Sequence, residues 1–286
     1  EAHAVPPQHG LFHLWENPSF VRRPQFLPHK MYPFSILFSD EHFVAINKPP
    51  GILMHRTRIS EDNVFVVQLL RDQIGQRVYP VHRLDRATSG VLIFGKNPDA
   101  SGRLGEQVMD KTVEKKYLAI VRGWVPENGT VDYALDDPDS GRGRLPAITH
   151  FTRLGCSEID HPIGLRHPTA RFSLIEAQLE TGRRHQIRKH FAHLNYPVIG
   201  DKRHGDVKHN TYFREVFGLR RMFLHSLLLS FQHPFTDTPT SISAPVDEVF
   251  DDTLRLLQLH EFCPLIGLPI VAPEHSKEIP RAGDAG

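Results

Sequence analysis

One nine-residue segment, His82-Arg83-Leu84-Asp85-Arg86-Ala87-Thr88-Ser89-Gly90, combines residue types that can do chemistry. It places one carboxylate, Asp85, between Arg83 and Arg86, with small turn-forming residues after it. Cationic neighbours favour the ionised form of a carboxylic acid, which is the form that a nucleophilic aspartate needs. An aspartate in a loop is also an ordinary turn residue, because its side chain accepts hydrogen bonds from nearby backbone amides. Position alone leaves both interpretations open.

A second segment is strongly basic. Residues 181–225 contain ten Lys and Arg against three Asp and Glu, with six histidines, whereas residues 236–286 contain nine acidic and three basic residues. A net charge of +1 for the whole chain hides these opposite excesses. A basic stretch is typical of contact with a phosphate-rich partner, because Lys and Arg release counterions from nucleic acid. A solvated helix face has the same composition, so charge alone does not decide.

The signatures of several other enzyme classes do not occur in the sequence. It contains no GxxxxGK[ST] phosphate loop, no GxGxxG dinucleotide motif and no GxSxG nucleophile elbow. His185, His190 and His193 are close in sequence, but spacings of five and three do not match a helical HExxH zinc site. The two cysteines, Cys156 and Cys263, exclude a disulfide scaffold and a four-cysteine zinc module. We therefore expect no metal and no nucleotide cofactor.

Periodic patterns predict the elements that must position these segments. Strands are predicted at 36–38, 43–46, 78–81, 90–94, 116–122, 147–154, 171–179 and 222–231, and helices at 60–74, 98–110, 183–194 and 249–259. In the helix that opens near Arg183, an apolar stripe (Ile187, Phe191, Leu194) faces away from three cations (Arg184, Arg188, Lys189). Strands outnumber helices and do not alternate strictly with them, so the sequence favours the α+β fold class.

Composition divides the chain into one domain with two extensions. Residues 1–30 carry five prolines without helical or strand period, and are predicted to be an irregular N-terminal extension. Residues 31–262 are predicted to form a single domain, and residues 263–286 a Pro-, Gly- and charge-rich tail. No apolar stretch is long enough to span a bilayer, and no apolar leader is evident near the N-terminus. We expect a cytoplasmic protein.

Four segments taken together resemble the motifs of the RluA-type pseudouridine synthases. The segment around Asp85 resembles the family's catalytic HRLD motif. Residues 45–51 (AINKPPG), 115–117 (KKY) and 181–188 (TGRRHQIR) are similar to its NKPxG, KxY and TGRxHQIR motifs, in the same order. The likeness extends from about residue 34 to residue 260. Residues 70–76 (LRDQIGQ) and 200–206 (GDKRHGD) also resemble the branch of the family that modifies uridine 65 of tRNA, in the T-stem region.

The resemblance implies a fold and an activity. The fold is a mixed, mostly antiparallel sheet with flanking helices and a central active-site cleft. The activity is the isomerisation of uridine to pseudouridine in RNA, most of all in tRNA, by a monomer that needs no cofactor. The catalytic motifs are shared within the family, so an rRNA-directed pseudouridine synthase remains an alternative. A non-catalytic RNA-binding protein is a second alternative, which loss of Asp85, Tyr117 or Arg188 would have favoured.

The resemblance also implies roles for individual residues. Asp85 is the expected catalytic residue, as a nucleophile or as a base at the sugar, and Arg188 is expected to pair with it. Tyr117 is expected to stack on the target base and to assist proton transfer from C5. The target nucleotide must leave the RNA helix, at a cost of a few kcal/mol that contacts to phosphates offset. The basic residues expected to grip the RNA are Arg83, Arg86, Arg184, Lys189, Lys202 and Arg203.

Overall fold

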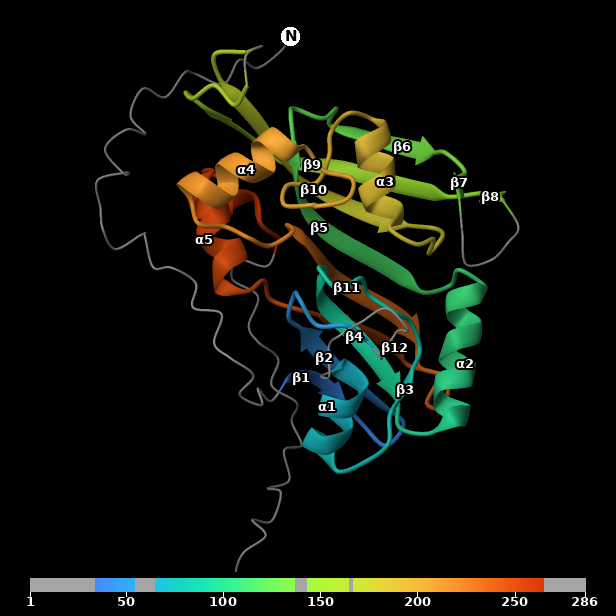
Figure 1. Ribbon diagram of the computed structural model, residues 1–286. Helices are drawn as coiled ribbons and strands as arrows, with labels where there is room; N and C mark the ends of the chain where they lie inside the picture. The colour runs from blue at the N-terminus through green and yellow to red at the C-terminus, as the bar shows by residue number, and fades with distance from the viewer. Residues whose placement is uncertain (1–33, 55–64, 137–142, 165–166, 265–286) are drawn as a thin grey trace, which may run out of the picture.

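The computed structural model describes residues 34–54, 65–136, 143–164 and 167–264 (Figure 1). Its centre is a ten-stranded sheet, to which a short two-stranded ribbon is added. The strands of the large sheet are β1 (Ser35–Ser39), β2 (Phe43–Lys48), β3 (Tyr79–Pro80), β4 (Ser89–Gly95), β5 (Glu114–Arg122), β6 (Asn128–Asp132), β9 (Ile148–Ile159), β10 (Ala170–Leu179), β11 (Leu224–Gln232) and β12 (Pro239–Ser243). The ribbon consists of β7 (Leu135–Asp136) and β8 (Arg144–Leu145).

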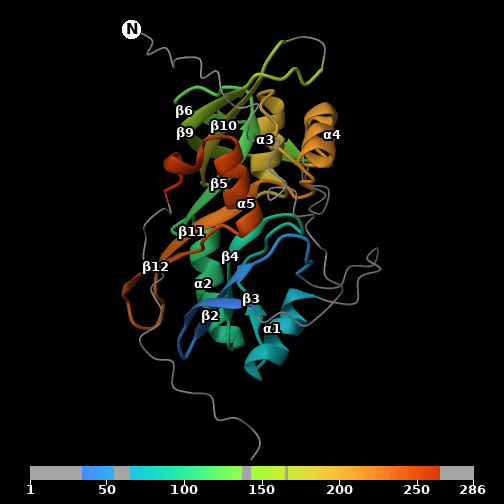
Figure 2. The same ribbon diagram turned by 90° about the vertical axis from the view of Figure 1, so that its left-hand side faces the viewer.

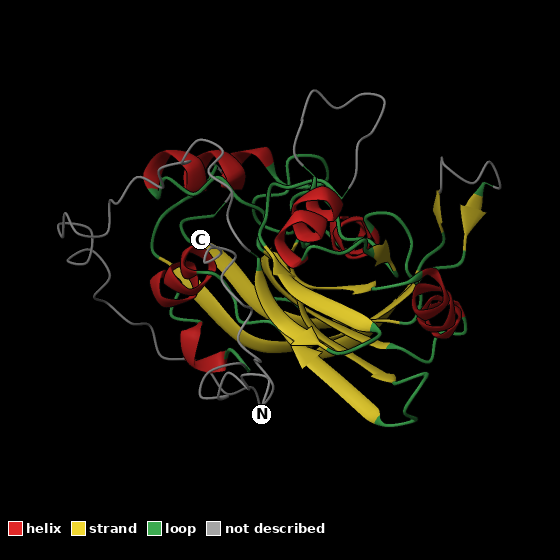
Figure 3. Ribbon diagram, turned by 90° about the horizontal axis from the view of Figure 1, so that it is seen from below, coloured by secondary structure: helices red, strands yellow, loops and turns green. Residues whose placement is uncertain are grey.

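The sheet joins two groups of strands at its middle. Its order is β1-β2-β4-β11-β5-β10-β9-β6, with β3 paired to β4 and β12 paired to β11. Every pairing is antiparallel except the one between β4 and β11, which is parallel and covers only two residue pairs. The strands lie side by side as one curved surface with helices on both sides (Figure 3). The short parallel pairing therefore connects the two groups.

In the described ranges, five α-helices and one 3-10 helix accompany the sheet. They are α1 (Val66–Ile74), α2 (Pro98–Met109), α3 (Gln186–His193), α4 (Val207–Val216), α5 (Glu248–Leu256) and the 3-10 helix His260–Phe262. Side-chain alternation along β5 assigns them to the two faces of the sheet. Tyr117 and Ala119 pack in one core cluster with side chains of α1 and α3, whereas Leu118 and Ile120 pack in another with side chains of α4 and α5.

The remaining helix, α2, closes a third cluster. Its Ala100 and Leu104 share this cluster with Ile93 of β4 and Leu229 of β11, on the face opposite to α1. In Figure 2, α1 and α2 lie near the same end of the molecule, with β4 rising from between them. The segments that contain Asp85 and Tyr117 belong to the face that α1 and α3 cover, because Leu84 and Tyr117 both contribute to that cluster. No helix in the described ranges has the length and apolar character needed to cross a bilayer.

The predicted fold class is confirmed, with shifts at several element ends. Gly75 ends α1 in the left-handed conformation, φ 66°, as its position predicts. The start of that helix differs, because Phe65 is its N-cap and Ser60 lies outside the described residues. The helix predicted from Arg183 begins instead at Gln186, because His185 has a left-handed backbone, φ 57°, that a helix cannot include.

Some elements were not predicted from the pattern. β6, β7, β8, β12 and α4 lack a clear apolar period, and within α4 only Phe213 is buried. The predicted extension, residues 1–30, lies outside the described residues, as does the predicted tail from residue 265 onward. Cys263, the first residue of that predicted tail, is 6% exposed and packs in the cluster around α4 and α5.

Candidate active site

The loop that carries Asp85 connects β3 to β4 and is held by the turn after β2. Lys48, which ends β2, is fully buried. Its Nζ donates hydrogen bonds to the carbonyl oxygens of Pro49, Arg86 and Thr88 at 3.0, 3.2 and 2.8 Å. The turn itself bonds to the loop in both directions, because Gly51 N donates to Arg86 O at 2.7 Å and Arg86 Nε donates to Gly51 O at 2.9 Å. The turn after β2 and the part of the loop directly after Asp85 are thus joined by several hydrogen bonds.

Gly90 allows this loop to approach β11. A Cβ atom at Gly90 would lie 2.1 Å from the carbonyl oxygen of Ser226, and its φ of +107° is one that other residues rarely adopt. The side chain of Ser226 in turn forms a hydrogen bond with Tyr117, the residue opposite it on β5. The glycine at the end of the catalytic segment therefore sets the distance between the Asp85 loop and Tyr117.

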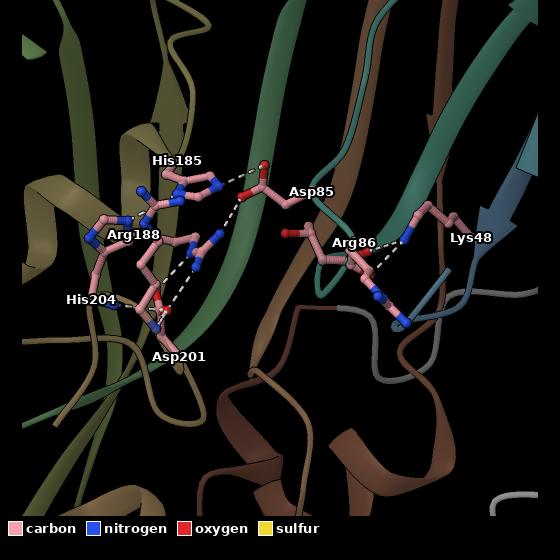
Figure 4. A network of polar contacts seen from close by, with 9 residues as sticks. Lys48, Asp85, Arg86, His185, Arg188, Asp201 and His204 are labelled. Atoms are coloured by element: carbon pink, nitrogen blue, oxygen red, sulfur yellow. Dashed lines mark hydrogen bonds and ion pairs between the residues drawn. The ribbon is translucent and has the colours of Figure 1, made fainter. Parts of the chain in front are cut away.

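Asp85 forms an ion pair with Arg188 of α3, as the resemblance implies (Figure 4). Arg188 Nη1 donates to Asp85 Oδ2 at 2.8 Å. The other side of the guanidinium group is bidentate with Asp201, through Nε to Oδ2 at 2.7 Å and Nη2 to Oδ1 at 2.8 Å. Bidentate pairing fixes the plane of a guanidinium group, so Asp201 orients the donor that faces Asp85.

The charges of this row are stabilised by one another. Burial alone would lower the pKa of Arg188, but hydrogen bonds to Asp201 and Asp85 outweigh burial and the pKa is raised. Burial would raise the pKa of Asp201, and the bonds from Arg188 and from backbone amides lower it instead. Both groups are therefore charged at neutral pH. Asp85 keeps about a fifth of its side-chain surface exposed, against 8% and 1% for Arg188 and Asp201, so it is the accessible end of the row.

Sequence reasoning did not assign a role to Asp201. The segment 200–206 that contains it was singled out only for its resemblance to one branch of the family. Asp201 also accepts backbone hydrogen bonds from Arg203 and His204 at 2.8 and 3.1 Å. The sequence Asp201-Lys202-Arg203 could have indicated this role. An aspartate in a turn can accept hydrogen bonds from the backbone amides of its own loop and also pair with an arginine of another element.

Two histidines complete the surroundings of Asp85. His185 Nε2 lies 3.8 Å from Asp85 Oδ1, and His185 Nδ1 lies 2.9 Å from His204 Nε2 (Figure 4). Burial lowers the pKa of His185 to about 4, against the opposing effect of Asp85, and the nearby Arg188 lowers it further. His185 is thus neutral at pH 7. Arg188 is then the cation that balances Asp85.

The other two histidines of the cluster lie apart from this row. His190 bonds to the Thr149 hydroxyl at 2.9 Å and to the Tyr133 carbonyl oxygen at 3.0 Å. His193 stacks on the Tyr133 ring, with centroids 3.8 Å apart. Within the described ranges, no three His, Cys, Asp or Glu side chains are grouped as metal ligands.

Tyr117 lies next to this row on β5 and is 8% exposed. Burial raises its pKa to about 12; the Ser226 hydrogen bond opposes this rise, and Asp85 adds to it. The phenol is therefore neutral at physiological pH. A neutral phenol can stack on a base and donate a hydrogen bond, but it is a poor general base. The expected contact with the base fits this chemistry better than the expected proton transfer from C5.

The basic residues predicted to bind RNA are placed unequally. Arg83, Lys202 and Arg203 are exposed, and the loop of the last two is tied to Asp201. Arg86 is exposed but bonded to Gly51, and Lys189 is half-buried with Nζ 2.9 Å from Asp136 O. Arg184 is half-buried as well. The structure thus brings Lys202 and Arg203 beside the Asp85 row.

Comparisons with known proteins agree with this geometry. The family model described as RNA pseudouridylate synthase matches residues 42–193, which include Asp85, Tyr117 and Arg188. The chain belongs to this family. The synthase is 42% identical to tRNA pseudouridine synthase C of Vibrio parahaemolyticus over 79% of its length and 96% of the relative. It is 43% identical to tRNA pseudouridine synthase C of Salmonella typhimurium over 77% of its length and 88% of the relative.

Solved structures agree on the fold. Human RNA Pseudouridylate Synthase Domain Containing 1 superposes with a TM-score of 0.61 at 22% identity, over 81% of this chain and 97% of that one. Human RNA Pseudouridylate Synthase Domain Containing 4 gives a TM-score of 0.62 at 22% identity, over 78% and 93%. The predicted family and its RNA substrate class are thereby confirmed for this synthase.

Proposed function

We propose that this synthase converts a uridine of tRNA to pseudouridine, at position 65 in the T-stem region. The observation that carries the proposal is the Asp85–Arg188–Asp201 row, placed beside Tyr117 by motifs that arrive from four separate parts of the chain. The relatives are named tRNA pseudouridine synthase C, and the match covers 96% and 88% of their length. These names support tRNA as the substrate. Position 65 rests on the resemblance of residues 70–76 and 200–206.

Asp85 acts at the sugar in this proposal. Its carboxylate accepts the Arg188 hydrogen bond at Oδ2, whereas Oδ1 lies 3.8 Å from the neutral His185 and is available to the bound nucleotide. The carboxylate either attacks C1′ of the ribose or removes the proton from C2′, and the C1′–N1 bond breaks with its electron pair on uracil. Arg188 keeps Asp85 ionised and oriented while it does so.

Tyr117 keeps the detached base in the site. The uracil must turn so that C5 faces C1′, and the flat wall of a buried neutral phenol lets the ring turn while excluding water. A C1′–C5 bond then forms while the Asp85–C1′ bond breaks, or, in the other route, while Asp85 returns the proton to C2′; C5 loses its proton and N1 gains one. Because no atom is gained or lost overall, the reaction needs no redox group and no nucleotide cofactor.

The exposed cations grip the RNA around the target. Arg83, Lys202 and Arg203 lie next to the Asp85 row, where they can contact the phosphates on either side of an extruded nucleotide. Arg86, Arg184 and Lys189 extend this surface. The proposal takes one copy of the chain per tRNA and places the reaction in the cytoplasm, in line with the family resemblance.

Tritium release tests the proposal. The protein is incubated with tRNA and with rRNA fragments that carry tritium at C5 of uridine, beside Asp85→Asn and the control Asp99→Asn. Asp99 is an exposed aspartate paired with Arg103 and lies outside the motifs of the site, so its replacement controls for loss of a surface carboxylate. We expect release from tRNA by the wild type and Asp99→Asn, and none by Asp85→Asn. Release from rRNA alone would contradict the proposed substrate, and residual release by Asp85→Asn would contradict the role of Asp85.

A tRNA in which position 65 is replaced by cytidine tests the site of modification. We expect this change to abolish release from an otherwise labelled tRNA. Undiminished release would assign the reaction to another uridine.

A further inference from the structure

Lys115 is a buried lysine that the mechanism above does not use. It lies on β5, two residues before Tyr117, and strand alternation directs both side chains to the same face of the sheet. Its residue surface is 7% exposed, and burial lowers the pKa of its ammonium group. A buried cation is costly unless something compensates it.

No protein group fills that role within the described part of the chain. Lys115 Nζ forms no hydrogen bond and no ion pair with any other described residue. Among the described residues, Gln107 Oε1 is the only side-chain polar atom that is both fully enclosed by protein and without a hydrogen-bond partner. Lys115 Nζ has no such partner either, so it is not fully enclosed and keeps contact with solvent. Lys115 Nζ is thus available to a ligand.

The groups around Lys115 belong to two catalytic motifs. His82, which opens the Asp85 segment, is close enough for Lys115 to lower its pKa; burial is the larger cause, and the pKa of His82 falls to about 4. A Cβ atom at Gly182, in the TGRRHQIR segment, would lie 4.0 Å from Lys115 Nζ. A neutral histidine and a glycine give Lys115 no negative charge. The ammonium group therefore stands between the Asp85 segment and the loop before α3, on the side where Tyr117 lies.

The adjacent lysine shows the ordinary alternative. Lys116 points to the other face and is 29% exposed at its side chain, with Glu114 at 3.7 Å and Glu176 at 3.3 Å. Lys116 is thus paired and partly solvated, as surface lysines are. Lys115 has no such partner among the described residues and is only 7% exposed, although the two residues are adjacent on one strand.

We propose that Lys115 binds the target base: its ammonium group donates a charge-assisted hydrogen bond to a carbonyl oxygen of the uracil ring. This inference rests on the proposed function. The depth of the residue favours the base over the RNA backbone, because the cations placed for phosphates, Arg83, Lys202 and Arg203, are exposed and Lys115 is not. Its place two residues from Tyr117 puts it along the ring that the base contacts.

The step that gains from this contact is bond cleavage. When C1′–N1 breaks, the electron pair passes to uracil and is shared by N1 and the carbonyl oxygens; Asp85 balances the change at the sugar. An ammonium group at a carbonyl oxygen is more strongly bound to this anion than to neutral uracil, so it lowers the barrier. When the C1′–C5 bond forms and the proton moves from C5 to N1, the ring is neutral again and Lys115 has neither gained nor lost a proton.

Single-turnover kinetics of Lys115→Met test the proposal, with Lys115→Arg and the matched control Lys116→Met. Methionine keeps the length of the side chain and removes the charge. Because removing one pre-positioned donor to a developing anion costs roughly 10²-fold in rate, we expect a loss of that order for Lys115→Met. We expect the tRNA Kd and its salt slope to stay unchanged, Lys115→Arg to recover part of the rate, and Lys116→Met to equal the wild type.

Melting temperature and salt dependence separate the other outcomes. Loss of an unpaired buried charge does not destabilise a fold, so Lys115→Met is expected to melt at or above the wild-type temperature. A wild-type rate in Lys115→Met would overturn the proposal, as would a lowered melting temperature with no recovery in Lys115→Arg. A weaker Kd with a salt slope smaller by about one would assign Lys115 to a phosphate and also overturn it. An inactive wild type would refute the proposed function instead.

Discussion

Two groups of charged residues meet at the active site and are built differently. The interior charges are Asp85, Arg188 and Asp201, which are joined by contacts of 2.7–2.8 Å. The surface cations are Arg83, Lys202 and Arg203, whose side chains are exposed and form no ion pair with the described residues. The first group is held in one geometry before RNA arrives. The second is free to adjust to the path of the RNA backbone.

This difference in burial separates the residues expected to control the reaction rate from those expected to control RNA affinity. Interior charges in low dielectric interact strongly and lose much if one partner is removed. Exposed charges are screened by salt, and each contributes little until it replaces a counterion on a phosphate. Changes to the interior group should therefore alter catalysis and stability, whereas changes to the surface group should alter RNA affinity and its salt dependence.

Arg188→Met should have the largest effect on stability and on turnover. It leaves Asp201, which is 1% exposed, as a buried carboxylate without its cation, and deprives Asp85 of its counterion. Breaking a buried pair by removing one partner costs about 3–5 kcal/mol, so we expect a loss of stability of that size and no turnover. Urea denaturation and tritium release measure the two effects. Arg203→Met, a surface change in the adjoining loop, is the control, and equal destabilisation by both would contradict the distinction.

Asp201→Asn should have an intermediate effect. It removes the bidentate partner of Arg188 but leaves Asp85 in place, so we expect a loss of stability of about 2–3 kcal/mol and a rate reduced roughly tenfold to a hundredfold. The pKa of Asp201 is lowered in the folded protein, so its contribution to stability is present above pH 4 and is lost as the pH falls through the folded value.

The stability difference between Asp201→Asn and the wild type should therefore shrink below about pH 4. Denaturation series at pH 7 and at decreasing pH test this. A difference that stays constant with pH would mean that the carboxylate charge of Asp201 is not what stabilises the row.

Joint replacement of Lys189 and Arg203 by alanine should have the smallest effect on the fold. Arg203 is exposed, and the Lys189 ammonium bonds only a backbone oxygen among the described residues. We expect an unchanged unfolding midpoint, weaker tRNA binding and a salt slope lower by about one to two, since each phosphate contact contributes about 0.9 to that slope. Binding at several salt concentrations measures it. An unchanged slope would place the RNA on another surface.

The sequence indicated the candidate site residues more directly than the strand pairing that aligns them. Asp85, Tyr117 and Arg188 were found from local motifs, and the structure brings them together. The two-residue parallel pairing of β4 with β11 was not predictable, because it joins residues more than a hundred positions apart and leaves no periodic signal. Only Gly90, whose missing side chain permits that approach, marked it in the sequence.

Asp201 escaped prediction for a related reason. Its partner Arg188 is thirteen positions earlier, on a helix that the sequence pattern predicted to be apolar on one side and cationic on the other. In the structure Arg188 is buried, 7% exposed, because two carboxylates from separate loops converge on it. The pattern of a single sequence contains no signal for two separate loops that meet at one side chain.

One measurement tests most directly that the interior charges govern the reaction and the surface cations govern binding. Single-turnover rate and tRNA Kd are measured for the wild type, for Asp85→Asn and for the Lys189/Arg203 double alanine variant. The account predicts that Asp85→Asn loses all turnover with Kd within a few-fold of the wild type, and that the double variant binds more weakly but turns over at the wild-type rate when tRNA is saturating. A double variant that is slow at saturation, or an Asp85→Asn protein that still turns over, would contradict it.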